Sequence, residues 1–346
     1  MTTNSPHVAS LDLATPAFES ELGSIRQLTS ETFPILTGMS VKEIVLEPGA
    51  IREPQWNVNA NQIAYVVSGT VLVSIFGNDD AFSTFVVKAG QMYHVESGAI
   101  YHIENVGEDQ AKIIAALRTD RPQHFSLHNS FNAMSNAVLG NTYDLPASAF
   151  DAFDRHGASQ IVHRDGPASI PDTAGLPNAH LFDVDGQLSP LAFPYGHVHQ
   201  ARKQYWAALE DLSMYTLDVT YTGMREPHWH PITGELGYVQ SGHARMTVLD
   251  PDGSLDTYLL EPGEAYFVPA AYPHHIEALT DGGIRFLIFF DQPMPADIGY
   301  RATASAFSRE VLSSAFGVPE KNLPSLPFTP MDPLIVGRSN PVDPIA

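Results

Sequence analysis

The chain has 346 residues and a formal net charge of -21, with 39 acidic side chains against 18 Lys and Arg residues. This balance argues against nucleic-acid binding, because a basic face supplies most of the affinity for a phosphate backbone. Hydrophobic residues make up 44% of the chain and charged residues 16%, which is typical of a globular protein long enough for two domains. The absence of cysteine excludes disulfide bonds and thiolate chemistry.

The ends and apolar segments of the chain bear on its location. The first ten residues contain no basic start followed by an apolar segment, and no later apolar run is long enough to cross a bilayer. We therefore expect no secretory signal, no membrane span and no membrane partner, and we favour a cytoplasmic location.

An internal repeat is the main organising feature of the sequence. At a constant offset of 173 residues, the segment 51–69 aligns with the segment 224–242. The first copy reads Arg52-Glu-Pro-Gln-Trp-Asn57, and the second reads Arg225-Glu-Pro-His-Trp-His230. A repeat of this size sets the fold, so we expect two related domains.

Each copy of the repeat consists of short apolar segments separated by Gly, Asn, Asp and Pro turns. This pattern predicts β-strands, and many short strands with such turns indicate a sandwich or a barrel. The predicted strands are 62–67, 71–76 and 84–87 in the first copy and 236–240, 244–249 and 257–260 in the second. We therefore expect an all-β protein with domains at 1–165 and 166–346.

Outside the repeats the sequence predicts a few short helices and extended segments. We expect a short helix at 145–155 and another at 302–316 that ends at Gly317. The segment 163–176 is rich in Pro, Gly and Asp and is expected to be a linker. The Pro-rich tail 319–346 is expected to run extended over the surface.

The second copy contains a candidate metal site. Side chains at i and i+2 of a strand point to the same face, so His228 and His230 would project together. Glu235 follows a turn at 231–234 and begins the next apolar strand, and a hairpin there would bring it opposite the histidines. His274 ends a further strand-and-turn segment. Three imidazoles and a carboxylate leave two octahedral positions open, which suits Mn or Fe better than a structural Zn.

The first copy has lost these ligands. It carries Gln55, Asn57, Gln62 and Tyr101 at the four positions, and amides bind Mn or Fe poorly compared with imidazole and carboxylate. Two interpretations remain open for this domain. It is either a structural scaffold for the pair of domains and the oligomer, or it holds a polar pocket that includes Arg52 and takes a small molecule without a metal.

The other histidines are interpreted as structural. His197 and His199 form a second same-face pair, but no carboxylate follows them at ligand spacing. His275 adjoins His274 and is expected to face away from the metal, because neighbouring strand residues point to opposite sides.

The metal-site residues resemble the two motifs of the cupin superfamily, HxHx₄Ex₆G and Gx₅PxxxxH. The segment from Met224 to Pro231 is similar to that of the bicupin oxalate decarboxylases, and the resemblance covers nearly the whole chain. It implies tandem double-sheet jelly rolls, a Mn²⁺ cofactor with Fe²⁺ as the alternative, and a homo-oligomer. It also implies that Arg225 binds a substrate carboxylate beside the metal.

The chain departs from that family at the proton donor. The family carries a Glu on a lid over the first-domain metal, whereas the corresponding segment 125–131 has none. A second family Glu is replaced by the apolar run 286–290, and the second lid region offers only Asp297 and Tyr300. Without a placed acid the radical formed by loss of CO₂ is oxidised, which favours oxidase or dioxygenase chemistry over decarboxylation.

Three functions remain open. The first is an Mn-dependent enzyme on oxalate or a related small anionic carboxylate, acting as decarboxylase or oxidase, with O₂ as co-substrate for the oxidase. The second is an Fe-type dioxygenase or other oxidoreductase on a larger substrate. The third is a non-enzymatic bicupin that binds a small ligand or serves as a storage protein. The intact ligand set disfavours storage, and the sequence does not separate the first two.

Overall fold

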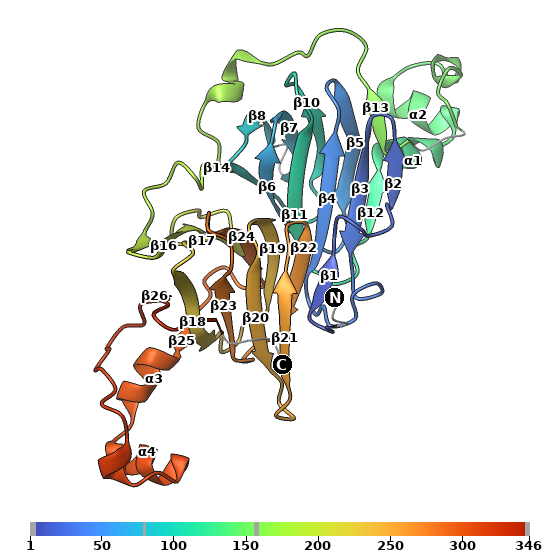
Figure 1. The fold of residues 1–346 in the computed structure, drawn as a ribbon. Helices are drawn as coiled ribbons and strands as arrows, with labels where there is room; N and C mark the ends of the chain where they lie inside the picture. The colour runs from blue at the N-terminus through green and yellow to red at the C-terminus, as the bar shows by residue number, and fades with distance from the viewer. Residues whose placement is uncertain (1–4, 79–80, 156–158, 343–346) are drawn as a thin grey trace. The chain divides into compact units, whose positions relative to one another are not determined.

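The computed structural model describes residues 5–78, 81–155 and 159–342, which form antiparallel sheets and a few short helices (Figure 1). Its contacts divide the chain into two compact units. The N-terminal unit comprises Leu13–Gly186 and Trp206–Asp211, and the C-terminal unit comprises Gln187–Tyr205, the chain from Leu212 onwards and the segment that ends at Asp12. The domain limits 1–165 and 166–346 stay a prediction, and the compact units exchange short segments relative to them.

Two sheets build the N-terminal unit. One has the strand order β14-β9-β6-β11-β4-β3-β2, and the other has the order β12-β5-β10-β7-β8, with β13 also paired to β5. The strands are β2 Phe18–Ser20, β3 Gly23–Leu28, β4 Ser40–Leu46, β5 Ala50–Asn57, β6 Gln62–Ser68, β7 Thr70–Phe76, β8 Phe82–Lys88, β9 Met92–Val95, β10 Ile100–Asn105, β11 Ala111–Leu117, β12 His124–Ser126, β13 Ile161–His163 and β14 Leu181–Phe182. Alternate residues of both sheets, such as Ile44, Val73 and Ile103, enter one hydrophobic core.

The C-terminal unit repeats this plan. Its sheets have the orders β1-β22-β19-β24-β17-β16-β15 and β21-β20-β23-β18-β25, with β26 also paired to β18. The strands are β1 Val8–Ser10, β15 Leu191–Phe193, β16 Gly196–Ala201, β17 Ser213–Val219, β18 Gly223–Trp229, β19 Glu235–Ser241, β20 Ala244–Leu249, β21 Leu255–Leu260, β22 Glu264–Val268, β23 His274–Ala278, β24 Ile284–Phe290, β25 Ile298–Gly299 and β26 Ile335–Gly337. Its core includes Leu217, Met246 and Phe286.

The prediction of two related all-β domains is confirmed. The order β9-β6-β11-β4-β3 of the first unit corresponds to β22-β19-β24-β17-β16 of the second. All six predicted strands are present, and their ends differ from the prediction by at most two residues. The sequence analysis did not predict that β1 would add to the edge of the second unit, with Val8 opposite Tyr266.

The helices differ more from the prediction. The structure has α1 Leu127–Asn132, α2 Asn136–Tyr143, α3 Tyr300–Ala306, α4 Arg309–Phe316 and the 3₁₀ helices η2 Ala147–Phe150, η3 Asp172–Gly175 and η4 Glu320–Asn322. The predicted helix 145–155 is thus reduced to one 3₁₀ turn, and the predicted helix 302–316 is two helices. Ser308 causes that break, because its hydroxyl accepts the amide of Val311 and starts α4 as an N-cap.

The end of α4 agrees with the sequence. Gly317 caps the helix in the left-handed region at a φ of 63°, which glycine adopts without steric cost. The tail beyond it is not wholly extended, since it contains η4 and the paired strand β26. Within the described residues, no helix combines the length and the apolar character needed to cross a membrane.

Candidate metal centre

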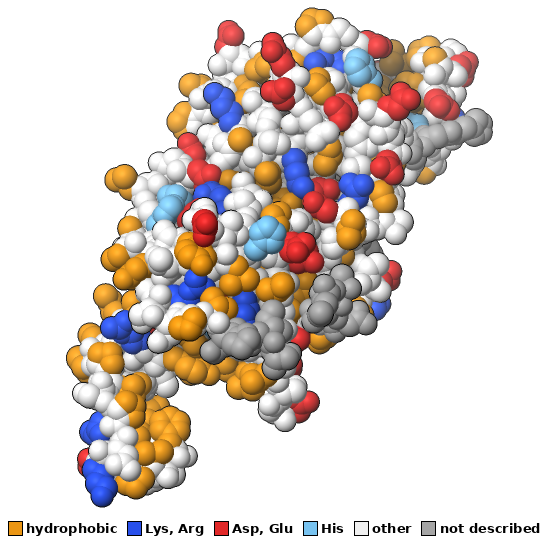
Figure 2. All heavy atoms as spheres, in the orientation of Figure 1, with side chains coloured by type: hydrophobic (Ala, Val, Ile, Leu, Met, Phe, Trp, Pro, Cys, Tyr) orange, Lys and Arg blue, Asp and Glu red, His pale blue; other side chains and the backbone are white. Residues whose placement is uncertain are grey.

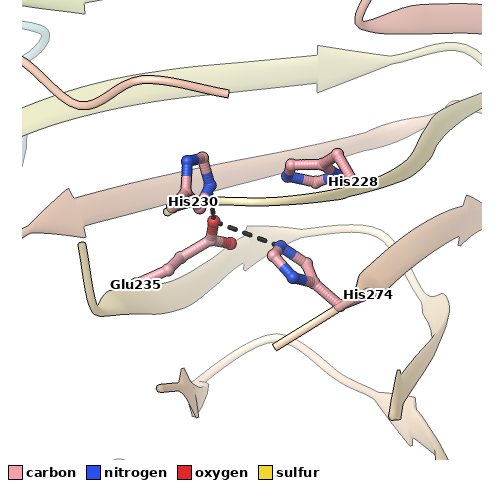
Figure 3. Close-up of side chains that lie close together, drawn as sticks. All are labelled: His228, His230, Glu235 and His274. Atoms are coloured by element: carbon pink, nitrogen blue, oxygen red, sulfur yellow. Dashed lines mark hydrogen bonds and ion pairs between the residues drawn. The ribbon is translucent and has the colours of Figure 1, made fainter. Parts of the chain in front are cut away.

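The four predicted ligands come together inside the C-terminal unit. His228 lies near the end of β18, His230 follows that strand, Glu235 begins β19 and His274 begins β23. All four side chains are buried, and one donor atom from each lies within 4.8 Å of the others (Figure 3). His228 pairs with His274 across the β18–β23 ladder, next to a bulge that shifts the register after Arg225. That the four residues hold a metal stays a proposal.

Backbone carbonyl groups fix the orientation of the three imidazoles. The Nδ1 atoms of His228, His274 and His230 lie 2.8, 2.9 and 3.1 Å from the carbonyl oxygens of Glu226, Tyr272 and Ala296. A carbonyl oxygen only accepts, so each Nδ1 is the donor and each Nε2 is left for the centre. This is the outer-shell arrangement that orients histidine ligands in metal sites.

Glu235 is held from both sides. Its Oε1 accepts the hydroxyl of Tyr266 at 2.6 Å, and its Oε2 lies 2.8 Å from His230 Nε2 and 3.4 Å from His274 Nε2. Burial opposes ionisation of Glu235, but His274 and His230 outweigh it and hold its pKa well below the usual value. Tyr266 was not singled out as a site residue, although the repeat aligns it with Tyr93, and this match was the available signal.

The pKa values of two of the imidazoles indicate how the site would accept a cation. Burial and then the charge of Arg225 lower the pKa of His228 well below 6.5. Burial also lowers the pKa of His230, but its hydrogen bonds to Asp297 and Glu235 outweigh this and raise the pKa to about 9. A divalent cation would take the place of the proton between His230 and Glu235.

The chemistry of the donor set fits a transition metal. His274 Nε2 is buried and makes no hydrogen bond within the described residues, so its lone pair is available for a ligand bond. Three neutral imidazole nitrogens and one carboxylate oxygen suit Mn²⁺ or Fe²⁺. These residues therefore fit the predicted cofactor.

Arg225 lies beside the four ligands but is already paired. Its guanidinium donates to the Leu334 carbonyl oxygen at 3.1 Å and lies 3.2 Å from Asp297 Oδ2, while Asp297 Oδ1 lies 2.7 Å from His230 Nδ1. Burial raises the pKa of Asp297, but Arg225 and His230 outweigh it and lower the pKa. Asp297 is thus an acidic group of lowered pKa at the site, in contact with both Arg225 and His230.

The cavity at this site is small and largely apolar. It measures about 30 Å³, which is room for about two water molecules. Its lining includes Arg225, Asp297 and three of the ligands, with Tyr215, Ile288 and Phe290 among the walls. Tyr300, the other residue considered as a proton donor, is 46% exposed on α3, and its ring packs edge-on against Trp229.

The other histidines that the sequence analysis singled out do not belong to the four-residue cluster. His197 and His199 form a half-buried cluster with Asp218, but Arg285 already pairs with that carboxylate at 2.9 Å. His275 points to Glu277 at 3.7 Å, away from the four ligands.

The corresponding positions of the N-terminal unit hold a network of amides and a phenol. Gln55 Nε2 donates to the Tyr101 hydroxyl at 3.2 Å, and that hydroxyl donates to Gln62 Oε1 at 3.1 Å. Asn57 Nδ2 donates to the same Gln62 oxygen at 3.4 Å. Since no imidazole or carboxylate belongs to this network, it does not offer the donors that Mn²⁺ or Fe²⁺ prefers.

Comparison with known proteins decides the family. The model of the cupin family matches residues 9–149 and 191–323. The chain belongs to the cupin family. Two matched segments make it a bicupin, and the resemblance drawn from the motifs of the second copy is confirmed.

The bicupin is similar to oxalate decarboxylases along most of its length. It is 26% identical to the oxalate decarboxylase OxdC of Bacillus subtilis over 293 residues, which covers 80% of this chain and 73% of OxdC. It is 23% identical to a probable oxalate decarboxylase of Arthroderma benhamiae over 307 residues, covering 86% of this chain and 75% of that protein.

Solved structures of the Bacillus subtilis enzyme share the fold. The structure at pH 4.6 superposes with a TM-score of 0.87 and 22% identity, covering 98% of this chain and 89% of that one. A structure from a study of the Mn(II) centers of the same enzyme superposes with a TM-score of 0.86, also at 22% identity, covering 98% of this chain and 90% of that one.

Proposed function

We propose that this bicupin is an enzyme with a single Mn²⁺ centre that acts on oxalate or a related small carboxylate. One observation carries the proposal: three imidazoles and a carboxylate converge beside a small cavity that Arg225 also lines. The similarity to oxalate decarboxylases supports the substrate, and the Mn(II) centers named for the Bacillus subtilis enzyme support the metal. Fe²⁺ is the alternative metal for the same donor set.

The residues around the centre would bind and orient the substrate. When bound, the metal supplies Lewis acidity and a redox couple for chemistry with a carboxylate and O₂. Arg225 would hold a carboxylate through two parallel N–H···O bonds, as guanidinium groups do. Because the cavity is small and Arg225 contacts Asp297, the substrate must displace Asp297 and open the site.

The surroundings of the site favour oxidation over decarboxylation. Decarboxylation to formate and CO₂ needs a proton delivered at carbon, whereas oxidation of oxalate by O₂ to CO₂ and H₂O₂ does not. In the lining of the cavity, the carboxyl groups are those of Glu235 and Asp297. The lowered pKa of Asp297 makes it a poor acid at neutral pH. We therefore place oxidase activity ahead of decarboxylase activity.

Metal analysis followed by turnover assays tests this function. The purified protein is expected to contain close to one Mn per chain and to consume oxalate, with H₂O₂ exceeding formate among the products. Absence of oxalate turnover by the Mn-loaded protein would sink the proposal. A protein that instead retains Fe and consumes O₂ only with a larger substrate would favour the dioxygenase alternative.

Asp297→Asn is expected to lower the KM for oxalate by roughly 5-fold, because it removes a charge that competes for Arg225. The Asn side chain keeps the size of the group and can still accept a hydrogen bond. Steady-state kinetics at matched metal content measure the effect. Arg225→Leu is the opposing control, and it should raise the KM. An unchanged or higher KM for Asp297→Asn would show that Asp297 does not compete with substrate.

We also propose that the protein is a homo-oligomer. Hydrophobic side chains are exposed over the α3–α4 segment, at the lower left of Figure 2. They include Phe307, Val311 and Phe316, which are 54%, 53% and 66% exposed. Contiguous apolar patches of this kind mark protein interfaces. The cytoplasmic location expected from the sequence also stays a prediction, which cell fractionation tests.

The double change Val311→Glu and Phe316→Glu is expected to dissociate the oligomer, because it places charges in the proposed apolar interface. Sedimentation velocity on the wild-type and variant proteins measures the change in mass. Lys321→Glu is a matched control in the same exposed segment and should leave the mass unchanged. A monomeric wild-type protein would contradict the proposed assembly.

A further inference from the structure

His197 and His199 lie on the face of their sheet that points away from the core. Both belong to β16, and Val198 between them enters the hydrophobic core and lines the small cavity of the four-ligand centre. Because alternate strand residues share a face, the two imidazoles project together from the opposite side of the sheet. The side chain of His197 is 44% exposed, so solvent and dissolved ions reach this face.

The carboxylate that the sequence spacing does not supply comes from the neighbouring strand. In the antiparallel β16–β17 ladder, Asp218 lies directly opposite His197, and such pairs are close neighbours. His197 Nε2 lies 3.4 Å from Asp218 Oδ2, and one donor atom each of His197, His199 and Asp218 lies within 4.8 Å of the others. Two ligand atoms at about 2.0–2.1 Å from a tetrahedral Zn²⁺ are about 3.4 Å apart. The three donors are therefore close enough to share one cation.

Neighbouring groups orient His199 and Asp218. His199 Nδ1 lies 3.2 Å from the Thr216 hydroxyl, and when Nδ1 donates there, Nε2 keeps its lone pair for a metal. Arg285 Nη1 donates to Oδ1 and Oδ2 of Asp218 at 3.1 and 2.9 Å, while its Nε donates to Gln240 Oε1 at 3.0 Å. An ionised carboxylate has about four lone-pair sites, so Asp218 can bind a cation while it pairs with Arg285. Arg285 thus acts as an outer-shell partner that holds the carboxylate in place.

The equivalent face of the N-terminal unit carries a different set of groups. There Arg26 pairs with Glu43 at 3.4 Å, and Lys112 pairs with the same carboxylate at 2.6 Å. Both cations lack a lone pair for a metal. At the repeat offset of 173 residues, and in the same strand register, the three donor positions correspond to Ser24, Arg26 and Val45. The pair of imidazoles with a facing carboxylate is therefore specific to the second unit.

We propose that His197, His199 and Asp218 form a Zn²⁺ site on the solvent-facing side of β16 and β17. Two imidazoles and a carboxylate, with water as the fourth ligand, make a set that Zn²⁺ binds in tetrahedral geometry. Mn²⁺ has the lowest affinity of the divalent first-row metals for such donors, so this site does not add to the Mn²⁺ content. The charge of Arg285 opposes that of the cation, and we expect reversible binding. The inference goes beyond the proposed function and holds whether or not the buried centre turns over oxalate.

Equilibrium dialysis against Zn²⁺ tests the site in the full chain. The background carries His230→Ala and His274→Ala, so that the buried centre loses two of its four ligands. We expect one Zn²⁺ per chain. In that background, His199→Gln should weaken binding by at least about 10-fold, since loss of an outer-shell partner alone costs that much. Asp218→Asn should weaken it too, and circular dichroism checks that each variant is folded.

His243→Gln is the matched control for His199→Gln. His243 is exposed, and its Nδ1 lies 3.3 Å from the Thr280 hydroxyl, much as His199 contacts Thr216. Within the described residues, it belongs to no group of three side chains that could hold a metal. The His243→Gln protein should keep the Zn²⁺ affinity of its background.

X-ray absorption on the Zn²⁺-loaded background protein identifies the ligands directly. Two imidazole nitrogens at about 2.0–2.1 Å are expected, a signature that a merely structural role of the histidines would not give. Unchanged Zn²⁺ affinity in the His199→Gln protein, or no Zn²⁺ bound at micromolar concentration, overturns the proposal. An equal loss of affinity in the His243→Gln protein would indicate dispersed binding to surface imidazoles and would overturn it as well.

Discussion

His274→Ala is expected to remove the metal from the C-terminal unit, whereas His275→Ala, one residue further along β23, should leave the metal in place. His274 directs Nε2 to Glu235 at 3.4 Å, and His275 points to Glu277 instead. Loss of an outer-shell partner already costs about 10–100-fold in metal affinity or activity, so loss of a direct ligand should exceed that. The measurement is metal content per chain after dialysis, followed by oxalate turnover.

His274 and His275 are neighbours on β23, so the His275→Ala protein is a matched control for the His274→Ala protein. Both changes remove an imidazole from the same strand, so a general effect on folding would appear in both proteins. Full metal retention by the His274→Ala protein would refute the ligand assignment. Loss of metal from both proteins would point to disruption of β23 instead.

Lys42→Met is expected to stabilise the N-terminal unit at neutral pH, because Lys42 is buried in its core. The pKa of Lys42 in the folded chain is about 7, below the ordinary 10.5, because burial and Arg52 disfavour the cation. Between these values the unfolded chain binds a proton more readily than the folded chain does. The resulting destabilisation is complete below pH 7 and is lost as the pH rises toward 10.5. Its full size is roughly 3 to 5 kcal/mol.

Chemical unfolding at pH 7 and at pH 10 measures this difference. The Lys42→Met protein should be the more stable at pH 7, and the difference from wild type should almost vanish at pH 10. Lys112→Met should change stability by less than about 1 kcal/mol at both pH values, because its ion pair is partly solvated. A Lys42→Met protein less stable than wild type at pH 7 would mean that Lys42 is compensated in the folded state.

The sequence by itself determined the repeat, the strand pattern and the four candidate ligands. The strand pattern and the His228–His230 pair depend on the two-residue period of extended chain, because alternate residues share a face at the end of β18 and just beyond it. The repeat then showed that metal ligands are replaced by amides at Gln55 and Gln62, because equivalent positions of related domains have equivalent environments. The end of α4 at Gly317 could also be predicted from local sequence, since it depends on a single residue that adopts a positive φ.

Only the tertiary structure decided what surrounds those residues. The contact of Asp297 with Arg225, the bond from Tyr266 to Glu235 and the addition of β1 to β22 join positions far apart in the chain. Burial in the packed core and the nearby charge of Arg52 lower the pKa of Lys42, and the sequence alone shows neither. Strand periodicity fixes the face on which a side chain lies, whereas packing between distant strands fixes its partners, its charge state and so its chemistry.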